Sequence, residues 1–158
     1  MDPIDGRLVE LLQANGRMTQ LELSRVVGLS QPAVAERLRK LEARGVITGY
    51  AALVDAAKLG KDITAFIGVG IEHPKYFEGF ARKVLALPEV QEAHRVAGQD
   101  SYLLKVRTEN TRTLDALLVE TLRTIPGVTR THTTIVLASA KETTHVHLPP
   151  QLLEGDRE

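Results

Sequence analysis

Four basic side chains within one predicted helix are the residues of this sequence whose type and spacing most clearly permit binding chemistry. The helix is the stretch LSQPAVAERLRKLEARG, residues 29–45, and its basic residues are Arg37, Arg39, Lys40 and Arg44. Guanidinium and ammonium groups bind phosphates and the acceptor atoms of guanine. Val34, Leu38 and Leu41 form one narrow apolar stripe on the same helix. One stripe is enough to pack a helix on a protein, so the basic side is available to a partner.

A second predicted helix and a tight turn must position this basic helix. Residues 19–27 form the preceding helix, Gly28 suits the positive φ of a turn, and Ser30 suits the N-cap of the next helix. The small Ser24 lets the two helices cross closely. The pattern predicts a helix-turn-helix over about residues 21–40, whose second helix enters the major groove of DNA. The alternative is a plain three-helix bundle with a solvated basic face.

The outward side of the second helix carries the residues that we expect at DNA. They are Ser30, Gln31, Pro32, Glu36, Arg37, Arg39, Lys40 and Arg44. Gln31 at the helix start could pair with a base edge, whereas the basic residues could hold phosphates or guanine. Arg37 lies near the rim of the apolar stripe. The pattern leaves open whether Arg37 contacts a phosphate or forms an internal salt bridge.

Composition limits the classes of protein that the chain can represent. Its 158 residues suggest one domain or two small ones, and no apolar run approaches the roughly 20 residues that span a bilayer. The start shows no signal-peptide pattern, and the lack of cysteine excludes disulfides and thiolate metal sites. These features favour a cytoplasmic protein. Because the net charge is +0, affinity for nucleic acid must come from a local patch.

Residues 1–60 are predicted to hold three helices and an extended linker strand. Asp2 and Thr19 suit the N-caps of the first two helices. The expected buried residues of the second helix are Leu23, Val26 and Val27.

The second half of the chain changes to an alternating, strand-like period. Strands are expected at residues 63–73, 89–98, 101–108 and 127–139, with helices at 74–87 and 111–125. The order is βαββαβ, and LALPEV and RTIPGV end the two helices in the same way, which is typical of a ferredoxin-like split fold. We expect this domain over residues 61–141. Residues 142–158, with two adjacent prolines and charged residues, are expected to form a loosely ordered tail.

One face of the predicted four-stranded sheet has no helix to cover it. The apolar residues expected there are Phe66, Ala93, Leu103 and Val136. Such a face is too apolar for water, so we expect a second subunit to cover it.

Both halves of the sequence resemble those of one family. TQLELSRVVGLSQPAVAERLRKLEARGVITGY resembles the DNA-binding half of the Lrp/AsnC (leucine-responsive, feast/famine) transcription regulators. RVAGQDSYLLKV and GVTRTHTTIVL resemble signatures of that family's ligand-sensing domain, named for regulation of amino acid metabolism (RAM). The resemblance runs from about Asp2 to Lys141.

The resemblance implies an α+β fold. An N-terminal helix-turn-helix, winged-helix-like domain precedes a C-terminal ferredoxin-like βαββαβ ligand-sensing domain, which forms a dimeric α+β barrel. It also implies partners: double-stranded DNA, a small-molecule effector that is an amino acid, and a homodimer assembling to an octamer with amino acids between dimers. No membrane partner and no cofactor are expected.

The resemblance places the effector at a turn between two strands. The implied effector-binding residues are Gly98, Gln99, Asp100, Ser101, Tyr102 and Thr133. Asp100 could accept from the ammonium group, and backbone N–H groups near Gly98, with Ser101 or Thr133, could donate to the carboxylate. The chain departs from the family here, because the aspartate that often follows the aromatic is replaced by Ser101 and the negative charge sits one place earlier. The alternative is a plain hairpin turn.

Other motifs carry less chemistry. His145 and His147 point to one side of an extended segment, but without a third ligand they are better explained as solvated histidines than as a metal site. GVG at residues 68–70 lacks the lysine of a phosphate loop. No catalytic set follows from spacing, so we expect no enzyme. The alternatives to an effector-dependent regulator are a small dimeric α+β-barrel enzyme and an effector-independent DNA-organising protein.

Overall fold

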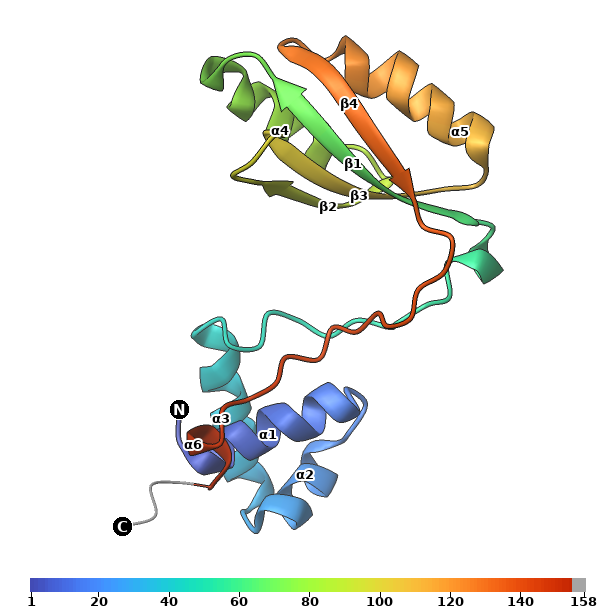
Figure 1. Ribbon diagram of the computed structural model, residues 1–158. Helices are drawn as coiled ribbons and strands as arrows, with labels where there is room; N and C mark the ends of the chain where they lie inside the picture. Colours follow the sequence, from blue (N-terminus) through green and yellow to red (C-terminus); the bar gives the residue numbers. More distant parts are fainter. Residues whose placement is uncertain (155–158) are drawn as a thin grey trace. The chain divides into compact units, whose positions relative to one another are not determined.

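The chain forms two compact units. The structure, a computed structural model, describes residues 1–154 (Figure 1). The first unit combines Met1–Leu53 with the segment that begins at Lys141, and the second is Val54–Ala140. The chain therefore passes between the units twice. The first passage comes at Leu53, earlier than the boundary at residue 60 expected from the sequence.

Three helices form the first unit, and each begins at the N-cap that the sequence indicates. The helices are α1 (Pro3–Ala14), α2 (Gln20–Val27) and α3 (Gln31–Ala43). The N-cap side chains of Asp2, Thr19 and Ser30 accept hydrogen bonds from backbone N–H groups three residues later. Gly28 ends α2 in the left-handed region with a φ of 71°, which glycine adopts without strain. The turn between α2 and α3 is thus fixed on both sides by local chemistry.

The apolar stripes of the three helices meet in one core. Its buried members are Leu8, Val9, Leu23, Val34, Leu38 and Leu41. Val26 was expected in this core but is 50% exposed. Val27 follows Leu23 by four residues and occupies the next place on the buried stripe, so Val26 lies beside that stripe.

The segment after Lys141 differs from the loosely ordered tail that the sequence suggested. It runs back to the first unit and ends in the short helix α6 (Gln151–Glu154) beside α1 (Figure 1). Leu148 packs against the core of the three helices. Polarity and two adjacent prolines suggested a loose tail, but this apolar contact holds the segment on the first unit. Residues 155–158 lie outside the described residues.

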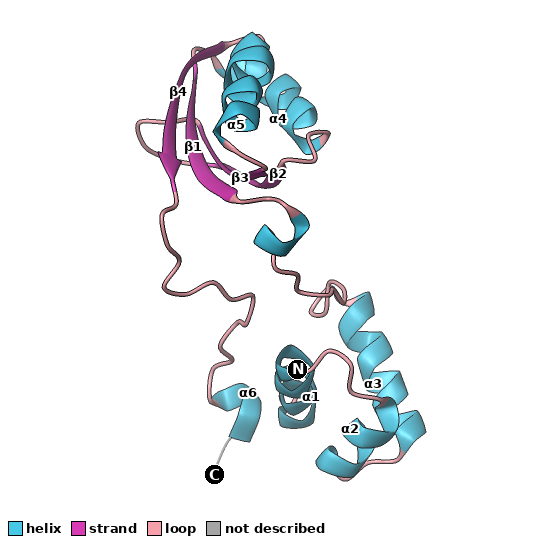
Figure 2. Cartoon of the chain, turned by 90° about the vertical axis from the view of Figure 1, so that its right-hand side faces the viewer, coloured by secondary structure: helices cyan, strands magenta, loops and turns pink. Residues whose placement is uncertain are grey.

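A four-stranded antiparallel sheet forms the second unit, as the sequence predicts. Its strands are β1 (Ile63–Ile71), β2 (Val90–Arg95), β3 (Tyr102–Thr108) and β4 (Val128–Ile135). They lie in the order β2-β3-β1-β4. Both helices, α4 (Phe77–Leu85) and α5 (Thr111–Ala116), cover one face of the sheet (Figure 2). A π-helical stretch, Leu117–Thr121, and a 3₁₀ turn, Leu122–Thr124, follow α5.

Alternate residues of β1 face the two sides of this sheet. Ala65, Ile67 and Val69 are buried in the helix-covered core with Phe80 of α4 and Leu114 of α5. The opposite face, called the open face below, carries Phe66 and its cross-strand neighbours Lys105 and Thr134.

Two of the four apolar side chains expected on the open face lie there. Phe66 and Leu103 are there and are 38% and 37% exposed. Ala93 was expected beside them, but it pairs with Leu104 and packs against the helix-covered core. A register shift between Val90 and Glu92 interrupts the alternation along β2 and turns Ala93 to the other side.

Within residues 1–154, no helix is long and apolar enough to cross a membrane.

Candidate functional site

The start of α3 presents two side chains to solvent. Gln31 and Pro32 are the first residues of the helix, and both are exposed. The Ser30 hydroxyl accepts from the Ala33 amide at 3.4 Å, so it is engaged as the N-cap. An exposed glutamine at a helix start has its amide oxygen and nitrogen available for a base edge.

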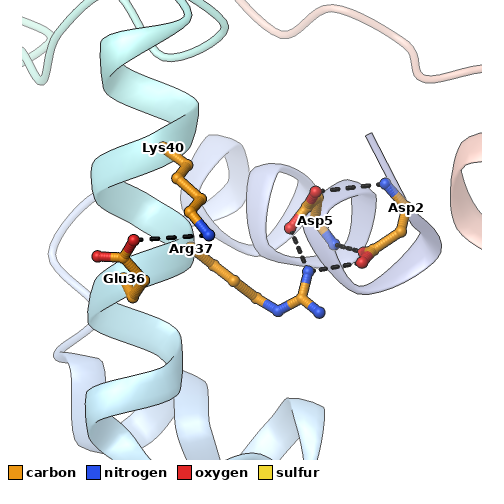
Figure 3. A network of polar contacts seen from close by, with 5 residues as sticks. All are labelled: Asp2, Asp5, Glu36, Arg37 and Lys40. Carbon is orange, nitrogen blue, oxygen red and sulfur yellow. Dashed lines mark hydrogen bonds and ion pairs between the residues drawn. The ribbon is translucent and has the colours of Figure 1, made fainter.

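One acidic and two basic side chains form a network on the outward side of α3. Arg39 donates from Nε and Nη2 to the two carboxylate oxygens of Glu36 at 2.9 Å and 2.8 Å. The Lys40 Nζ lies 3.5 Å from Glu36 Oε1 (Figure 3). The hydrogen bonds from Arg39 lower the pKa of the Glu36 carboxyl to about 2, so this group is ionised at neutral pH.

These exposed ion pairs leave both cations accessible to another anion. The Arg39 and Lys40 side chains are 66% and 64% exposed. Exposed pairs of this kind contribute little to stability, so another anion such as a phosphate can replace Glu36 as the partner. Arg44, the C-cap residue of α3, is also exposed. Glu36 therefore orients Arg39 and Lys40, and both side chains remain able to bind another anion.

Arg37 points to the other side and holds α3 against α1. Its Nη1 lies 2.6 Å from Asp2 Oδ2 and 2.7 Å from Asp5 Oδ1 (Figure 3). The hydrogen bonds to Asp2 and Asp5 raise the pKa of Arg37. The amide of Asp5, followed by Arg37, lowers the pKa of Asp2. Of the two roles that the sequence left open, the structure shows the internal salt bridge.

A second charged pair occupies the turn before β3. The Asp100 carboxylate lies over β1 at Gly68, where a Cβ atom would overlap Asp100 Oδ2. Arg130 of β4 places Nη2 3.3 Å from Asp100 Oδ1 and donates to the Gln99 carbonyl. Gly70 leaves room for the Arg130 side chain. The two glycines of GVG thus admit an acidic and a basic side chain to one region of the open face.

Sequence patterns missed Arg130 because its partner lies 30 positions away. The signal in the sequence was the pair of glycines two positions apart, which places both on the same face of a strand.

Of the other expected effector-binding residues, Gly98 and Gln99 share the turn with Asp100, whereas Tyr102 and Thr133 lie on the other side of the sheet. The Ser101 amide donates to Val69 O at 2.9 Å, and its hydroxyl accepts from the Ile71 amide at 3.1 Å, so both groups are engaged by β1. Tyr102 is 7% exposed and packs against Phe80 on the helix-covered side. Thr133 pairs with Ile67 and so faces that same side. Asp100 and Arg130 therefore lie on one face, and Tyr102 and Thr133 on the other. Gly98 and Gln99 are exposed in the turn.

One histidine of the C-terminal segment contacts the first unit. His145 Nε2 lies 3.5 Å from Glu10 Oε1 of α1. Among residues 1–154, no group of three or more His, Cys, Asp or Glu side chains is placed to hold a metal ion.

Comparison with known proteins assigns both units to families. Residues 1–48 match the winged helix-turn-helix DNA-binding family, and residues 64–146 match the Lrp/AsnC ligand binding domain. The leucine-responsive regulatory protein of Escherichia coli strain K12 is 39% identical over 144 residues, which cover 90% of this chain and 88% of the relative.

Solved structures agree over nearly the whole chain. A transcriptional regulator from Neisseria meningitidis in complex with L-methionine has a TM-score of 0.90 at 33% identity, covering 96% of this chain and 99% of that one. The feast or famine regulatory protein from M. tuberculosis, complexed with L-methionine, has a TM-score of 0.86 at 37% identity, covering 94% and 99%. These relatives are regulators, so the alternative of a barrel enzyme is not retained. The chain belongs to the Lrp/AsnC family of transcription regulators, with an N-terminal DNA-binding unit and a C-terminal ligand-binding unit.

Proposed function

We propose that this regulator recognises specific DNA sequences through the outward face of α3. The proposal rests on one observation, that the basic residues of α3 point to two different sides of the helix. Arg37 is held by α1, whereas Arg39 and Lys40 are oriented outward by Glu36 and stay exposed. In a chain of net charge +0 this face supplies the local basic patch that DNA requires.

Each outward residue has a role in this proposal. Arg39, Lys40 and Arg44 contact phosphates or guanine, which fixes α3 in the major groove. Gln31 contacts a base edge, with Pro32 beside it. Glu36 orients the two cations and can accept from the amino group of cytosine. A protein that acts on chromosomal DNA works in the cytoplasm of a bacterial or archaeal cell, and we place it there.

The open face of the sheet supports a homodimer as the working form. Phe66 and Leu103 expose apolar surface on that face, and a second copy of the chain is the partner that we propose for it. A dimer presents two copies of α3, so each DNA-binding unit meets one half-site of a pseudo-palindrome. Further assembly of dimers, up to the octamer that the family resemblance implies, completes the proposal.

We further propose that a free amino acid is the effector and binds at the turn of Asp100. A zwitterion matches the charged pair found there: Asp100 accepts from the ammonium group and Arg130 donates to the carboxylate. The Neisseria meningitidis and M. tuberculosis relatives were both solved with L-methionine, which supports an amino acid. A site at a contact between dimers would let the ligand favour one assembly, which couples sensing to DNA occupancy.

DNA selection followed by affinity measurement tests the proposal for α3. The full chain is used to enrich binding sites from random DNA, and wild type is compared with the double variant Arg39→Ala/Lys40→Ala. We expect weaker binding. The slope of log affinity against log salt should fall by about one unit for each phosphate that the variant no longer binds. Gln31→Ala should change sequence preference more than overall affinity.

The chain offers a matched control on α4. Arg82 and Lys83 are also adjacent and exposed, and Arg82 pairs with Glu78 as Arg39 does with Glu36. Arg82→Ala/Lys83→Ala removes the same charge and should bind like wild type. Equal affinity for the two double variants would exclude α3 as the DNA-binding helix.

The second candidate is a regulator that needs no effector. It is favoured by one observation, that Asp100 and Arg130 already satisfy each other in the single chain. Calorimetry with each of the twenty amino acids separates the two candidates. If no amino acid gives a heat of binding, the turn is a structural hairpin and the regulator needs no effector.

A further inference from the structure

The C-terminal strap, defined here as residues 145–153, lies along α1 of the DNA-binding unit. It belongs to the same compact unit as the three helices, although it follows the last strand of the sensing unit in sequence. It makes three contacts with this unit: with α1 near the C-terminal end of that helix, with the core of the three helices at Leu148, and with α1 near its N-terminal end.

At the first place, Gln13 binds the strap backbone with both ends of its side-chain amide. Gln13 Nε2 donates to Val146 O at 2.9 Å, and the Val146 amide donates to Gln13 Oε1 at 2.7 Å. His145 lies 3.5 Å from Glu10, one helical turn earlier on α1. This paired arrangement reproduces a strand-to-strand hydrogen-bond pair and fixes the register of the strap on the helix.

At the second and third places, the strap and the helix pack together. Leu148 joins the core of the three helices. Further along, the backbone carbonyl of Leu152 lies directly on Gly6, so that a Cβ atom at position 6 would overlap it. Glycine is unfavourable inside a helix, and Gly6 is the fourth residue of α1. The close approach of the strap explains why position 6 has no side chain.

The strap meets Gly6 next to the residues that hold α3. Asp5 precedes Gly6 in the chain, and Asp5 and Asp2 bind Arg37 of α3. A strap that holds the start of α1 thereby holds the carboxylates against which α3 is oriented.

We propose that the surface of α1 along Gly6 and Gln13 is the docking surface for the chain's own C-terminal strap, and that the docked strap positions α3 for DNA. Gly6 and Gln13 are the positioning residues, because they act on DNA through α1 and Arg37 and touch no nucleic acid. The inference rests on the proposed function in one respect only, the use of α3 as the DNA-binding helix.

Gly6→Ala in the full chain is the decisive variant, because the presence of the docked strap determines whether the substitution lowers or raises stability. Without a docked strap, alanine is the better residue in a helix interior and the variant would be at least as stable as wild type. With the strap docked, the added methyl group expels it. Gly79→Ala is the matched control, since Gly79 is inside α4 and a methyl group added there would have no neighbour within 4 Å.

The measurements are amide hydrogen exchange and DNA affinity. Exchange at Val146, whose amide is bound by Gln13, and at Leu152 and Leu153 should become about tenfold faster in Gly6→Ala and stay unchanged in Gly79→Ala. Affinity for a selected DNA site should fall about fivefold or more, with an unchanged salt slope because every phosphate ligand is retained.

Two results would overturn the proposal. Unchanged exchange in Gly6→Ala, with a thermal stability equal to or above that of wild type, would show that the strap is not docked. Faster exchange with wild-type DNA affinity would show that the strap is docked but does not position α3. Gln13→Ala provides the same two readouts if Gly6→Ala fails to fold. The exchange data require no DNA, so they remain valid even if α3 proves not to be the DNA-binding helix.

Discussion

Arg37 and Asp5 join α3 to α1 through an ion pair in which Arg37 Nη1 lies 2.7 Å from Asp5 Oδ1. Arg39, two positions later, points away by roughly 200° around the helix axis and pairs with Glu36 on the surface. One basic helix therefore contains two kinds of cation, one that fixes the helix and one that is available to DNA. Because Arg37 and Arg39 lie on different sides of α3, we expect their substitution to affect different properties of the protein.

Removal of Arg37 should destabilise the DNA-binding unit while all the proposed phosphate ligands remain. Arg37→Ala leaves Asp2 and Asp5 without their shared partner, so the free energy of unfolding should fall by about 1–2 kcal/mol. Urea denaturation measures this decrease, and a salt titration of DNA binding should keep the wild-type slope. Arg39→Ala should leave the free energy of unfolding close to that of wild type and reduce the salt slope of DNA binding. A slope reduced by Arg37→Ala would make Arg37 a phosphate ligand.

The stabilising effect of Asp2 should disappear in acid. The Asp5 amide, and then Arg37, hold the pKa of Asp2 below its ordinary value of 3.8 in the folded chain. The stabilisation is therefore fully present above pH 3.8 and disappears as the pH falls through the lower, folded pKa. Thermal unfolding of wild type and Asp2→Asn between about pH 2 and pH 7 tests this. The two unfolding midpoints should differ by a constant amount at neutral pH and converge in acid. A difference that widened in acid would show that folding does not lower the pKa of Asp2.

Local chemistry explains why much of the fold could be predicted. The N-caps Asp2, Thr19 and Ser30 and the turn at Gly28 act on neighbouring backbone groups, so their consequences are visible in sequence. The failure at Ala93 has the opposite cause. Strict alternation along β2 places Ala93 on the open face, but an irregularity in the pairing of β2 with β3 reverses the sides, and no residue type marks it.

The candidate sites could be predicted only in part, because some of their contacts join distant parts of the chain. Gln31, Arg39 and Lys40 could be identified because helical periodicity alone turns them outward. The partnership of Asp100 with Arg130 depends on the pairing of β1 with β4, and the docking of Leu148 depends on the packed core beside α1. Neither leaves a periodic signal in the sequence.

A charge on the open face of the sheet should prevent dimer formation. Phe66→Asp would place an unpaired carboxylate in the proposed subunit interface, where burial of a charge is costly. Sedimentation velocity of the full chain should then show a monomer, whereas wild type sediments as a dimer or a larger assembly. Leu85→Asp is the control, since Leu85 is 81% exposed on α4, on the other side of the sheet. A dimer of Phe66→Asp as stable as that of Leu85→Asp would exclude this face as the interface.

Asp100 should determine whether an amino acid binds. Asp100→Asn keeps the shape of the side chain over Gly68 but removes the charge that attracts an ammonium group. Removal of a charge-assisted hydrogen bond should weaken the ligand by at least about tenfold in calorimetry with L-methionine and the other amino acids. Arg130→Ala should have a comparable effect by removing the donor to the ligand carboxylate.

Asp115→Asn, a change at an exposed carboxylate on α5, controls for net charge in this experiment and should bind the amino acid like wild type. DNA affinity without ligand should be the same in all of these variants, because Asp100 and Arg130 lie outside the DNA-binding unit. Wild-type amino-acid affinity in Asp100→Asn would place the effector elsewhere and leave the Asp100–Arg130 pair as a structural closure of the turn.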